Sequence, residues 1–368
     1  MAKIDALFDK MVERGGSDLH LREGQVPNIR LYGDLIPLTD HPLSHEEICD
    51  LMSEAAGEER WKIFQERGDL DFAYEKDEHA RYRTNYMRHV HGIGALFRLI
   101  PTRILPLEVL GAPEIVKSFA RVRGGLVLVT GPTGSGKSTT LAGLIDYMNQ
   151  GFARHIVTIE EPIEFVHRNK LSVITQREVP IHTPSFAAGL KAALREDADV
   201  VLVGEMRDLE TIALALTAAE TGLLVFGTLH TNNARKTVDR IIDVFPADRQ
   251  PQIRTMLASS LRGVVAQLLL RRCDKPGRIA TFEVLVGTLS VSSIIREGKT
   301  EKLTDVLMSG RGEGMQIMDD AIMQLLEEGI ISGEEAYMKS NEKVRFAEYL
   351  PQTEGEEEEG GAGKKKQK

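Results

Sequence analysis

The segment GPTGSGKST at 131–139 has the spacing G-x-x-x-x-G-K-[ST] of a phosphate-binding loop. The apolar run LVLVT precedes it and a helical pattern follows it, so the strand and helix that such a loop needs are both predicted. The glycines let successive backbone N–H groups turn toward phosphate oxygens, Lys137 would reach the β- and γ-phosphates of ATP, and Ser138 would bind Mg²⁺. The expected nucleotide contacts are Gly131, Thr133, Gly134, Ser135, Gly136, Lys137, Ser138 and Thr139. The alternative is a chance glycine loop, which this context disfavours.

Carboxylates follow two further apolar runs. The run VVLV ends at Gly204-Glu205, where a P-loop ATPase usually presents a magnesium-site carboxylate, although the aspartate expected just before it is missing. The segment TIEEPIEF places Glu160 and Glu164 after another strand, and parallel strands end at the same sheet edge. We therefore expect Glu160, Glu164 and Glu205 to hold magnesium through water and to orient or deprotonate the hydrolytic water. Glu161 is expected to be a solvated loop charge.

Three basic side chains near these runs are further candidates. His230 closes VFGTLHT, where it could sense the γ-phosphate, bridge to a neighbouring subunit, or serve only as a structural hydrogen-bonding group. Arg195 and Arg207 could contact the nucleotide or a neighbouring chain, because a planar guanidinium stays charged and binds two phosphoryl oxygens. The alternative for each arginine is a solvated surface charge.

Four short apolar strands must position this chemistry. They are LVLVT, HIVTIEE, DVVLVGE and LLVFGTLH, and helical stretches alternate with them. Such alternation predicts an α/β domain with a mostly parallel sheet, whose ligands bind at the carboxyl ends of the strands.

The flanking regions have other patterns. Residues 26–100 show mostly two-residue alternation around a helical stretch at 44–64, which predicts a small α+β domain, and the pattern after about 285 is helical. The predicted organisation is an N-terminal α+β domain at 1–100, a linker at 101–113, an ATPase core at 114–285, a helical C-terminal region at 286–350 and a disordered charged tail at 351–368.

Composition restricts the function classes. The formal charge of −9 over 368 residues argues against a dedicated nucleic-acid binder, which normally presents a basic face. The absence of an apolar run of about 18 residues argues against direct membrane insertion. The two cysteines, Cys49 and Cys273, are far apart and form no CxxC pair, so we expect neither a metal knuckle nor a disulfide framework, and a reducing compartment fits.

Taken with these motifs, the chain closely resembles the secretion ATPase family, and within it the pilus retraction ATPases. The similarity runs from residue 1 to about 340. It includes SDLHLREG, the phosphate-binding loop, IEEPIEF as the acidic box of the family, VGEMRDLETIALALTAAETGLLVFGTLHT through the Walker B and histidine boxes, and DRIIDVFP.

The resemblance implies roles for individual residues. Glu205 would be the Walker B carboxylate and Glu164 the catalytic base, with ATP as the substrate and Mg²⁺ as the metal. Arginines of the N-terminal domain would reach the nucleotide phosphates, and the matching positions are Arg83 in RYRTN and Arg98 in ALFRLIP.

The resemblance also implies an assembly. It predicts a homo-hexameric ring of RecA-like domains, each preceded by a PAS-like domain, on the cytoplasmic face of an inner-membrane pilus platform protein. Hydrolysis would rotate each N-terminal domain against the next ATPase domain and turn the platform, so that pilins return to the membrane. The absence of a four-cysteine zinc motif or a long N-terminal extension argues against the pilus assembly ATPase.

Three segments depart from the family pattern. The acidic box has Glu160-Glu161 where the family usually has Glu-Asp, a conservative change. The helix written AIRNLIRE in the family is SVSSIIREGK here, a difference that bears on coupling more than on hydrolysis. The tail from about 351 has no counterpart.

Two alternative functions stay open. One is an accessory paralogue that partners the retraction ATPase, and the other is a RecA-like nucleic-acid translocase, which would need a basic, aromatic-interleaved track.

Overall fold

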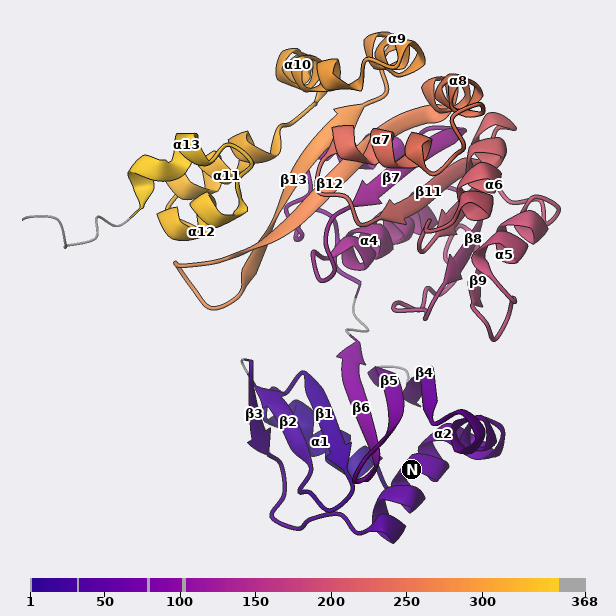
Figure 1. Cartoon of the computed structure of the whole chain (residues 1–368), viewed down its shortest axis with the longest axis vertical. Coiled ribbons are helices and arrows are strands. Elements are labelled where there is room, and N and C mark those ends of the chain that lie inside the picture. The colour runs from indigo at the N-terminus through magenta and orange to yellow at the C-terminus, as the bar shows by residue number, and fades with distance from the viewer. Residues whose placement is uncertain (1, 32, 78–79, 101–103, 351–368) are drawn as a thin grey trace, which may run out of the picture.

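The computed structural model describes residues 2–31, 33–77, 80–100 and 104–350. Within these ranges the chain builds two sheets, each with its own hydrophobic core (Figure 1). We call the smaller sheet with its helices the N-terminal domain and the larger one with its helices the core domain. The N-terminal domain lies below the core domain in Figure 1, on the side where the phosphate-binding loop begins α4.

The N-terminal domain contains an antiparallel sheet in the order β3-β2-β1-β6-β5-β4. Its strands are β1 (Asp18–Arg22), β2 (Asn28–Leu31), β3 (Asp34–Pro37), β4 (Asp69–Asp77), β5 (Ala80–His89) and β6 (Gly92–Ile100). The long strands β4, β5 and β6 form a meander. As in any strand, alternate residues of β5 face the same side of the sheet.

Two helices cover this sheet, α1 (Asp5–Glu13) and α2 (His45–Arg67). Ser44 and Glu47 form a capping box at the start of α2, and Gly68 ends the helix in the left-handed conformation at φ +80°. Phe8 of α1 stacks on Tyr82 of β5 with ring centroids 3.8 Å apart, and both side chains are fully buried. This aromatic packing fixes β5, whose residues Arg81 and Arg83 face the core domain.

The core domain contains a seven-stranded sheet in the order β13-β12-β7-β11-β10-β8-β9. The strands are β7 (Gly125–Thr130), β8 (His155–Glu160), β9 (Val173–Glu178), β10 (Val200–Val203), β11 (Leu224–Leu229), β12 (Leu261–Arg271) and β13 (Arg278–Val286). All neighbouring pairs are parallel except β12 and β13, so β7, β8, β10 and β11 end at one edge.

Both faces of this sheet are buried, which is why its strands are apolar without polar alternation. Leu126 and Leu128 pack on one side, and Val127 and Val129 on the other. The first side is covered by α5 (Phe186–Ala193), α6 (Leu209–Glu220), α7 (Ala234–Asp243) and α8 (Gln250–Ser260), and the second by α3 (Glu114–Phe119) and α4 (Lys137–Gly151).

The C-terminal region is helical. It comprises α9 (Leu289–Glu297), η1 (Thr300–Lys302), α10 (Leu303–Ser309), η2 (Gly310–Glu313), α11 (Met318–Glu327), α12 (Gly333–Lys339), α13 (Lys343–Phe346) and η3 (Ala347–Tyr349). Helices α9 and α10 contribute to the same hydrophobic core as α7 and α8. Helices α11 to α13 pack on the end of the long β12–β13 hairpin around Leu270 and Phe346 (Figure 1). No helix in the described part of the chain is long and apolar enough to cross a membrane.

The four predicted core strands, the helix at 44–64 and the helical C-terminal region are confirmed. Strands β1, β9, β12 and β13 were not predicted. Residues 104–113 form neither helix nor strand, but Leu107 is buried against α4, so this part of the expected linker packs on the core domain. The rest of that linker at 101–103 and the expected tail at 351–368 lie outside the described residues. The predicted domain boundaries themselves stay predictions.

Candidate active site

The phosphate-binding loop lies between β7 and α4, as its spacing predicts. Gly131, Gly134 and Gly136 have φ of +146°, +77° and +88°, values that L-residues with a Cβ rarely adopt. A Cβ on Gly131 would lie 2.3 Å from the carbonyl oxygen of Gln267, so the loop is also held close to β12. Conformation therefore favours glycine at all three positions, and lack of space adds to this at Gly131.

Lys137 begins α4 and folds back over the loop. Its Nζ donates to the carbonyl oxygens of Gly131 at 2.8 Å and Pro132 at 3.1 Å. Burial lowers the pKa of Lys137, and the charges of Glu205 and Glu164 oppose this effect. The ammonium group is thus held by weak carbonyl partners that an anionic ligand can replace.

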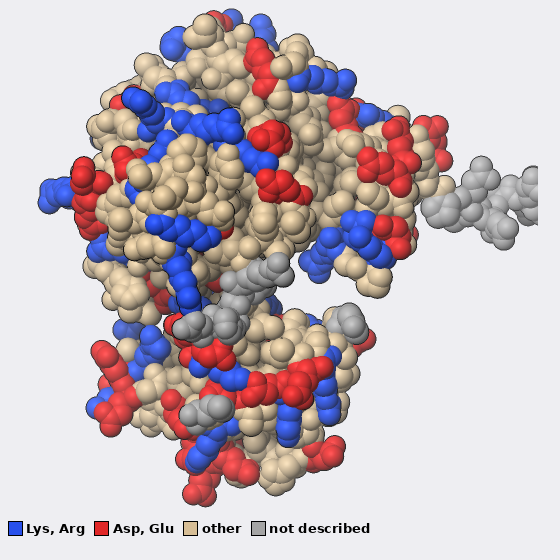
Figure 2. Space-filling view, turned by 180° about the vertical axis from the view of Figure 1, so that it is seen from behind, with Lys and Arg blue, Asp and Glu red and all other residues tan. Residues whose placement is uncertain are grey.

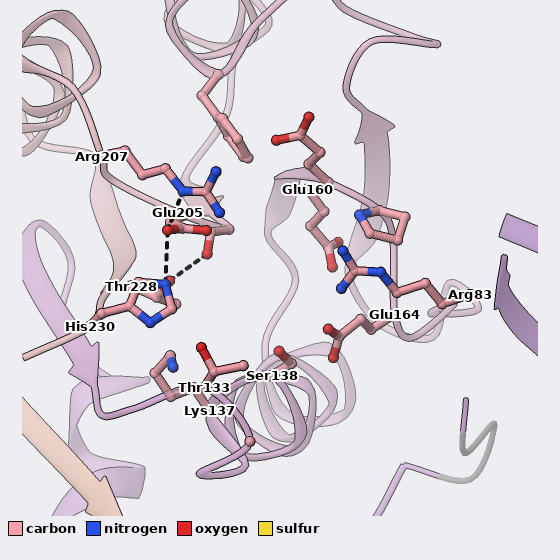
Figure 3. Close-up of a pocket in the computed structure, with 15 residues that line it drawn as sticks. Arg83, Thr133, Lys137, Ser138, Glu160, Glu164, Glu205, Arg207, Thr228 and His230 are labelled. Atoms are coloured by element: carbon pink, nitrogen blue, oxygen red, sulfur yellow. Dashed lines mark hydrogen bonds and ion pairs between the residues drawn. The ribbon is translucent and has the colours of Figure 1, made fainter. Parts of the chain in front are cut away.

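Residues from four strand ends and from the N-terminal domain surround one cavity of about 330 Å³ (Figure 3). Its lining residues are Arg83, Thr133, Gly134, Lys137, Ser138, Glu160, Glu161, Pro162, Glu164, Phe186, Gly204, Glu205, Arg207, Thr228 and His230. The loop and α4 form one wall, and the carboxylates of β8 and β10 form the opposite one. The side chains expected to act together are therefore in one place.

Glu205 follows β10 and accepts hydrogen bonds from His230 and Arg207. Nε2 of His230 lies 2.8 Å from Oε1 of Glu205, and Nε of Arg207 donates to the same oxygen. Burial alone would raise the pKa of Glu205, but the hydrogen bonds and charges of Arg207 and His230 outweigh it, so the pKa lies below its usual value. The carboxylate is therefore ionised at neutral pH.

Glu160 ends β8 in a contrasting environment. Its Oε1 accepts from Oγ1 of Thr158 at 2.6 Å and from Nε2 of Gln176 at 3.3 Å. Burial raises its pKa to about 7, and the negative charge of Glu164 adds to this effect, although the two hydrogen bonds lower it. Two carboxyl groups in one cavity thus have pKa values displaced in opposite directions, an arrangement typical of catalytic sites.

Arg83 is the contribution of the N-terminal domain to the cavity. It lies in β5 and its guanidinium extends toward Glu164 and the start of α4 (Figure 3). Arg98 pairs with it across β5 and β6 in register, but its Nε donates to Oδ1 of Asp18 at 2.7 Å, and it does not line this cavity. Arg195 is exposed after α5, also outside the cavity.

Several residues that sequence analysis did not single out contribute to the site. Gln176 and Thr158 hold Glu160, and Oγ1 of Thr228 donates to the carbonyl oxygen of Gly204, which orients the turn before Glu205. Phe186 adds an apolar wall. Glu161, expected to be a solvated loop charge, is exposed and also lines the cavity. The polar pattern VITQRE did not predict a strand, so neither β9 nor the position of Gln176 beside Glu160 was expected.

The donor set fits an ATP phosphate chain with a magnesium ion. A glycine loop of this kind can present backbone N–H groups to phosphate oxygens, and Oγ of the buried Ser135 has no hydrogen-bond partner within the described residues. The hydroxyl of Ser138 and the ionised carboxylate of Glu205 are hard oxygen ligands of the kind that Mg²⁺ prefers.

A glycine loop between a buried parallel strand and a helix, facing a carboxylate at the end of another strand of the same sheet, defines a P-loop ATPase. The chain belongs to the family described as Type II/IV secretion system protein, whose model matches residues 66–352. This confirms the resemblance and the predicted α/β fold class.

Individual relatives agree with this assignment. The chain is 47% identical to the type IV pilus retraction ATPase PilT of Pseudomonas aeruginosa, over 93% of this chain and 99% of that protein. It is 50% identical to a twitching motility protein of Neisseria gonorrhoeae, over 84% and 83% of the two chains. A crystal structure of the pilus retraction motor PilT with bound ADP superposes with a TM-score of 0.87 at 40% identity, covering 94% of this chain and 98% of that one.

Proposed function

We propose that this chain is a motor ATPase that couples ATP hydrolysis to retraction of a type IV pilus. The observation that carries the proposal is the composition of the cavity, in which Arg83 of the N-terminal domain approaches the phosphate-binding loop and the carboxylates of the core domain. A phosphate chain bound there contacts both domains, so its hydrolysis changes the force between them. The similarity to PilT supports pilus retraction as the work that this motion performs.

Each residue has a role in this proposal. The loop N–H groups and Lys137 bind the phosphates, and Ser138 and Glu205 would hold Mg²⁺. Bound there, Mg²⁺ would neutralise charge on the phosphate oxygens. Glu164 accepts the proton of the attacking water, and Glu160, which is neutral at lower pH, donates or accepts a hydrogen bond beside it. His230 and Arg207 leave Glu205 as the ligands arrive and approach the γ-phosphate.

A second hollow extends from the same loop and accommodates the rest of the nucleotide. It has a volume of about 1300 Å³ and is lined by Pro132, Thr133 and Gly134, the β12–β13 hairpin, α12 and the N-terminal domain. Figure 2 shows a hollow between the domains, with Lys and Arg side chains on the lobe above it. We assign the base and ribose to this side, because the carboxylate wall occupies the other.

The working form is a homo-hexamer at the cytoplasmic face of an inner-membrane pilus platform protein. In this proposal Arg98 acts only in the assembled ring. Because it is paired with Asp18 and outside the cavity of its own chain, it would reach phosphates only across a subunit interface. An accessory paralogue and the platform protein are the partners expected, and nucleic acid is not.

The test is ATP turnover per subunit over a range of protein concentrations, with and without single- and double-stranded DNA, with Glu205→Ala as the blank. We expect turnover per subunit to rise with concentration, to ignore DNA and to vanish in the blank. Strong stimulation by DNA would favour a translocase, and the absence of turnover at every concentration would favour an accessory subunit. Retraction in cells that lack their own motor then tests the coupling.

A further inference from the structure

Strand β5 contacts the core domain at two positions on one face. Arg83 lines the catalytic cavity, and Arg81, two residues earlier and therefore on the same side of the strand, pairs with Glu178 of β9. Nη2 of Arg81 lies 3.4 Å from Oε2 of Glu178, and the two side chains are only 13% and 5% exposed. This ion pair crosses the boundary between the two domains.

Glu178 is connected directly to the acidic loop. It ends β9 opposite Glu160, the last residue of β8, in the parallel register. The same oxygen that faces Arg81 accepts the backbone N–H of Ile163 at 3.1 Å. Ile163 is buried and immediately precedes Glu164, so the position of one carboxylate oxygen sets the backbone that carries the expected catalytic base.

Residues of both domains also line a second cavity beside this pair. A cavity of about 230 Å³ beside the catalytic one is lined by Asp71, Phe72 and Arg83 of the N-terminal domain, and by Glu161, Pro162, Glu178 and Arg207 among residues of the core domain. Because both partners of the pair are largely removed from water, the loss of either one leaves a buried charge without compensation. The two side chains are therefore expected to stay paired when one of them moves.

From this arrangement we infer that Arg81 and Glu178 are positioning residues that couple the N-terminal domain to the acidic loop. When Arg83 is drawn to or released from the phosphates, Arg81 moves on the same strand, and Glu178 passes the displacement to the Ile163 amide and Glu164. The pair sets the geometry of the base without touching the nucleotide. This inference rests on the ATPase activity proposed above.

Four variants test it in the wild-type chain: Arg81→Met, Arg81→Lys, Glu178→Gln and the double variant Arg81→Met with Glu178→Gln. The matched control is Arg177→Met, which removes an ion pair from the same strand, because Nη1 of Arg177 lies 2.8 Å from Oε1 of Glu196 within the core domain. The readouts are kcat, KM, binding of a fluorescent ATP analogue, and hydrogen exchange of a peptide that covers 160–165.

We expect kcat to fall about tenfold in Arg81→Met and Glu178→Gln while KM and analogue binding stay near wild type, because a small misplacement of a catalytic group affects the chemical step. The double variant should lose no more than either single one, since both remove one interaction. Exchange at 160–165 should be faster in these variants, and Arg81→Lys should recover part of the activity. Arg177→Met should leave all four readouts unchanged.

The inference is overturned if Arg81→Met and Glu178→Gln keep wild-type kcat and exchange, if their effects on kcat add in the double variant, or if Arg177→Met reproduces them. If a variant is too unstable to assay, hydrogen exchange at 160–165 in Arg81→Lys is the test. Faster exchange than in wild type supports the inference, and unchanged exchange overturns it. Turnover of the wild type in the same assay separates the two proposals. An inactive wild type refutes the ATPase and this inference with it, whereas an active wild type with unaffected variants refutes only the positioning role.

Discussion

Nε2 of His230 donates to Oε1 of Glu205 across 2.8 Å, between the ends of the neighbouring strands β11 and β10. The strands are parallel and in register, so the histidine and the carboxylate meet although 25 residues separate them. The imidazole thus occupies a position where it can exchange the carboxylate for a phosphate oxygen.

We predict that His230→Ala lowers turnover about 100-fold while ATP affinity is nearly unchanged, because a positioned imidazole contributes mainly in the transition state. Steady-state kinetics and binding of a fluorescent ATP analogue measure the two quantities. Arg235→Ala, which removes an exposed cation from the start of α7, is the control and should leave both unchanged. Equal losses of turnover and affinity would show that His230 is a binding residue instead.

Lys137→Gln should weaken ATP binding about 10- to 100-fold, because the amide removes a charged donor to phosphate oxygens. Titration with the same fluorescent analogue measures the change. The carbonyl groups of Gly131 and Pro132 keep a donor in the variant, so thermal unfolding without nucleotide should differ little from wild type. Undiminished affinity would contradict the role of this lysine.

Gly131→Ala should lower the free energy of unfolding by about 1–3 kcal/mol and abolish ATP binding. The new Cβ would lie 2.3 Å from the carbonyl oxygen of Gln267 and 2.6 Å from Oγ of Ser135, at a φ of +146°. Gly151→Ala is the matched control, since no atom lies within 4 Å of its Cβ position at the end of α4. Urea unfolding and analogue binding distinguish the variants, and equal behaviour would refute the steric argument.

The raised pKa of Glu160 predicts a pH-dependent gain of stability in Glu160→Gln. The folded protein favours the protonated carboxyl, so the wild type loses stability as pH rises from 4.5 toward about 7. The amide has no such dependence, and the variant should be more stable than wild type by up to about 3 kcal/mol at about pH 8, with little difference near pH 4.5. Urea unfolding at both pH values measures this. A difference independent of pH would contradict it.

Arg83→Ala and Arg98→Ala should have different effects. Arg83 lines the cavity, so its loss should lower turnover about 10- to 100-fold with little change in stability. Loss of Arg98 leaves the buried Asp18 with fewer partners and should lower the free energy of unfolding by about 1 kcal/mol. Kinetics and urea unfolding of both variants test this. A strong loss of turnover in a stable Arg98→Ala protein would show that Arg98 acts across a subunit interface.

Local patterns predicted many elements correctly where one physical constraint dominated. The glycine spacing at 131–136 predicts the loop because φ above zero admits few other residues. The run Val200–Val203 predicts a central strand because both of its faces are buried. Strand β9 escaped prediction because it is half exposed and polar, at the edge of the sheet.

The sequence by itself determined the phosphate-binding loop, the carboxylates after β8 and β10, and the parallel sheet that brings them together, because each depends on neighbours in the chain or on burial. The tertiary structure decided which distant groups complete the site. It placed Arg83 in the catalytic cavity and Arg98 outside it, although the two residues lie opposite each other on adjacent strands. It also joined Arg81 to Glu178, since a contact between domains depends on how two separately folded surfaces meet.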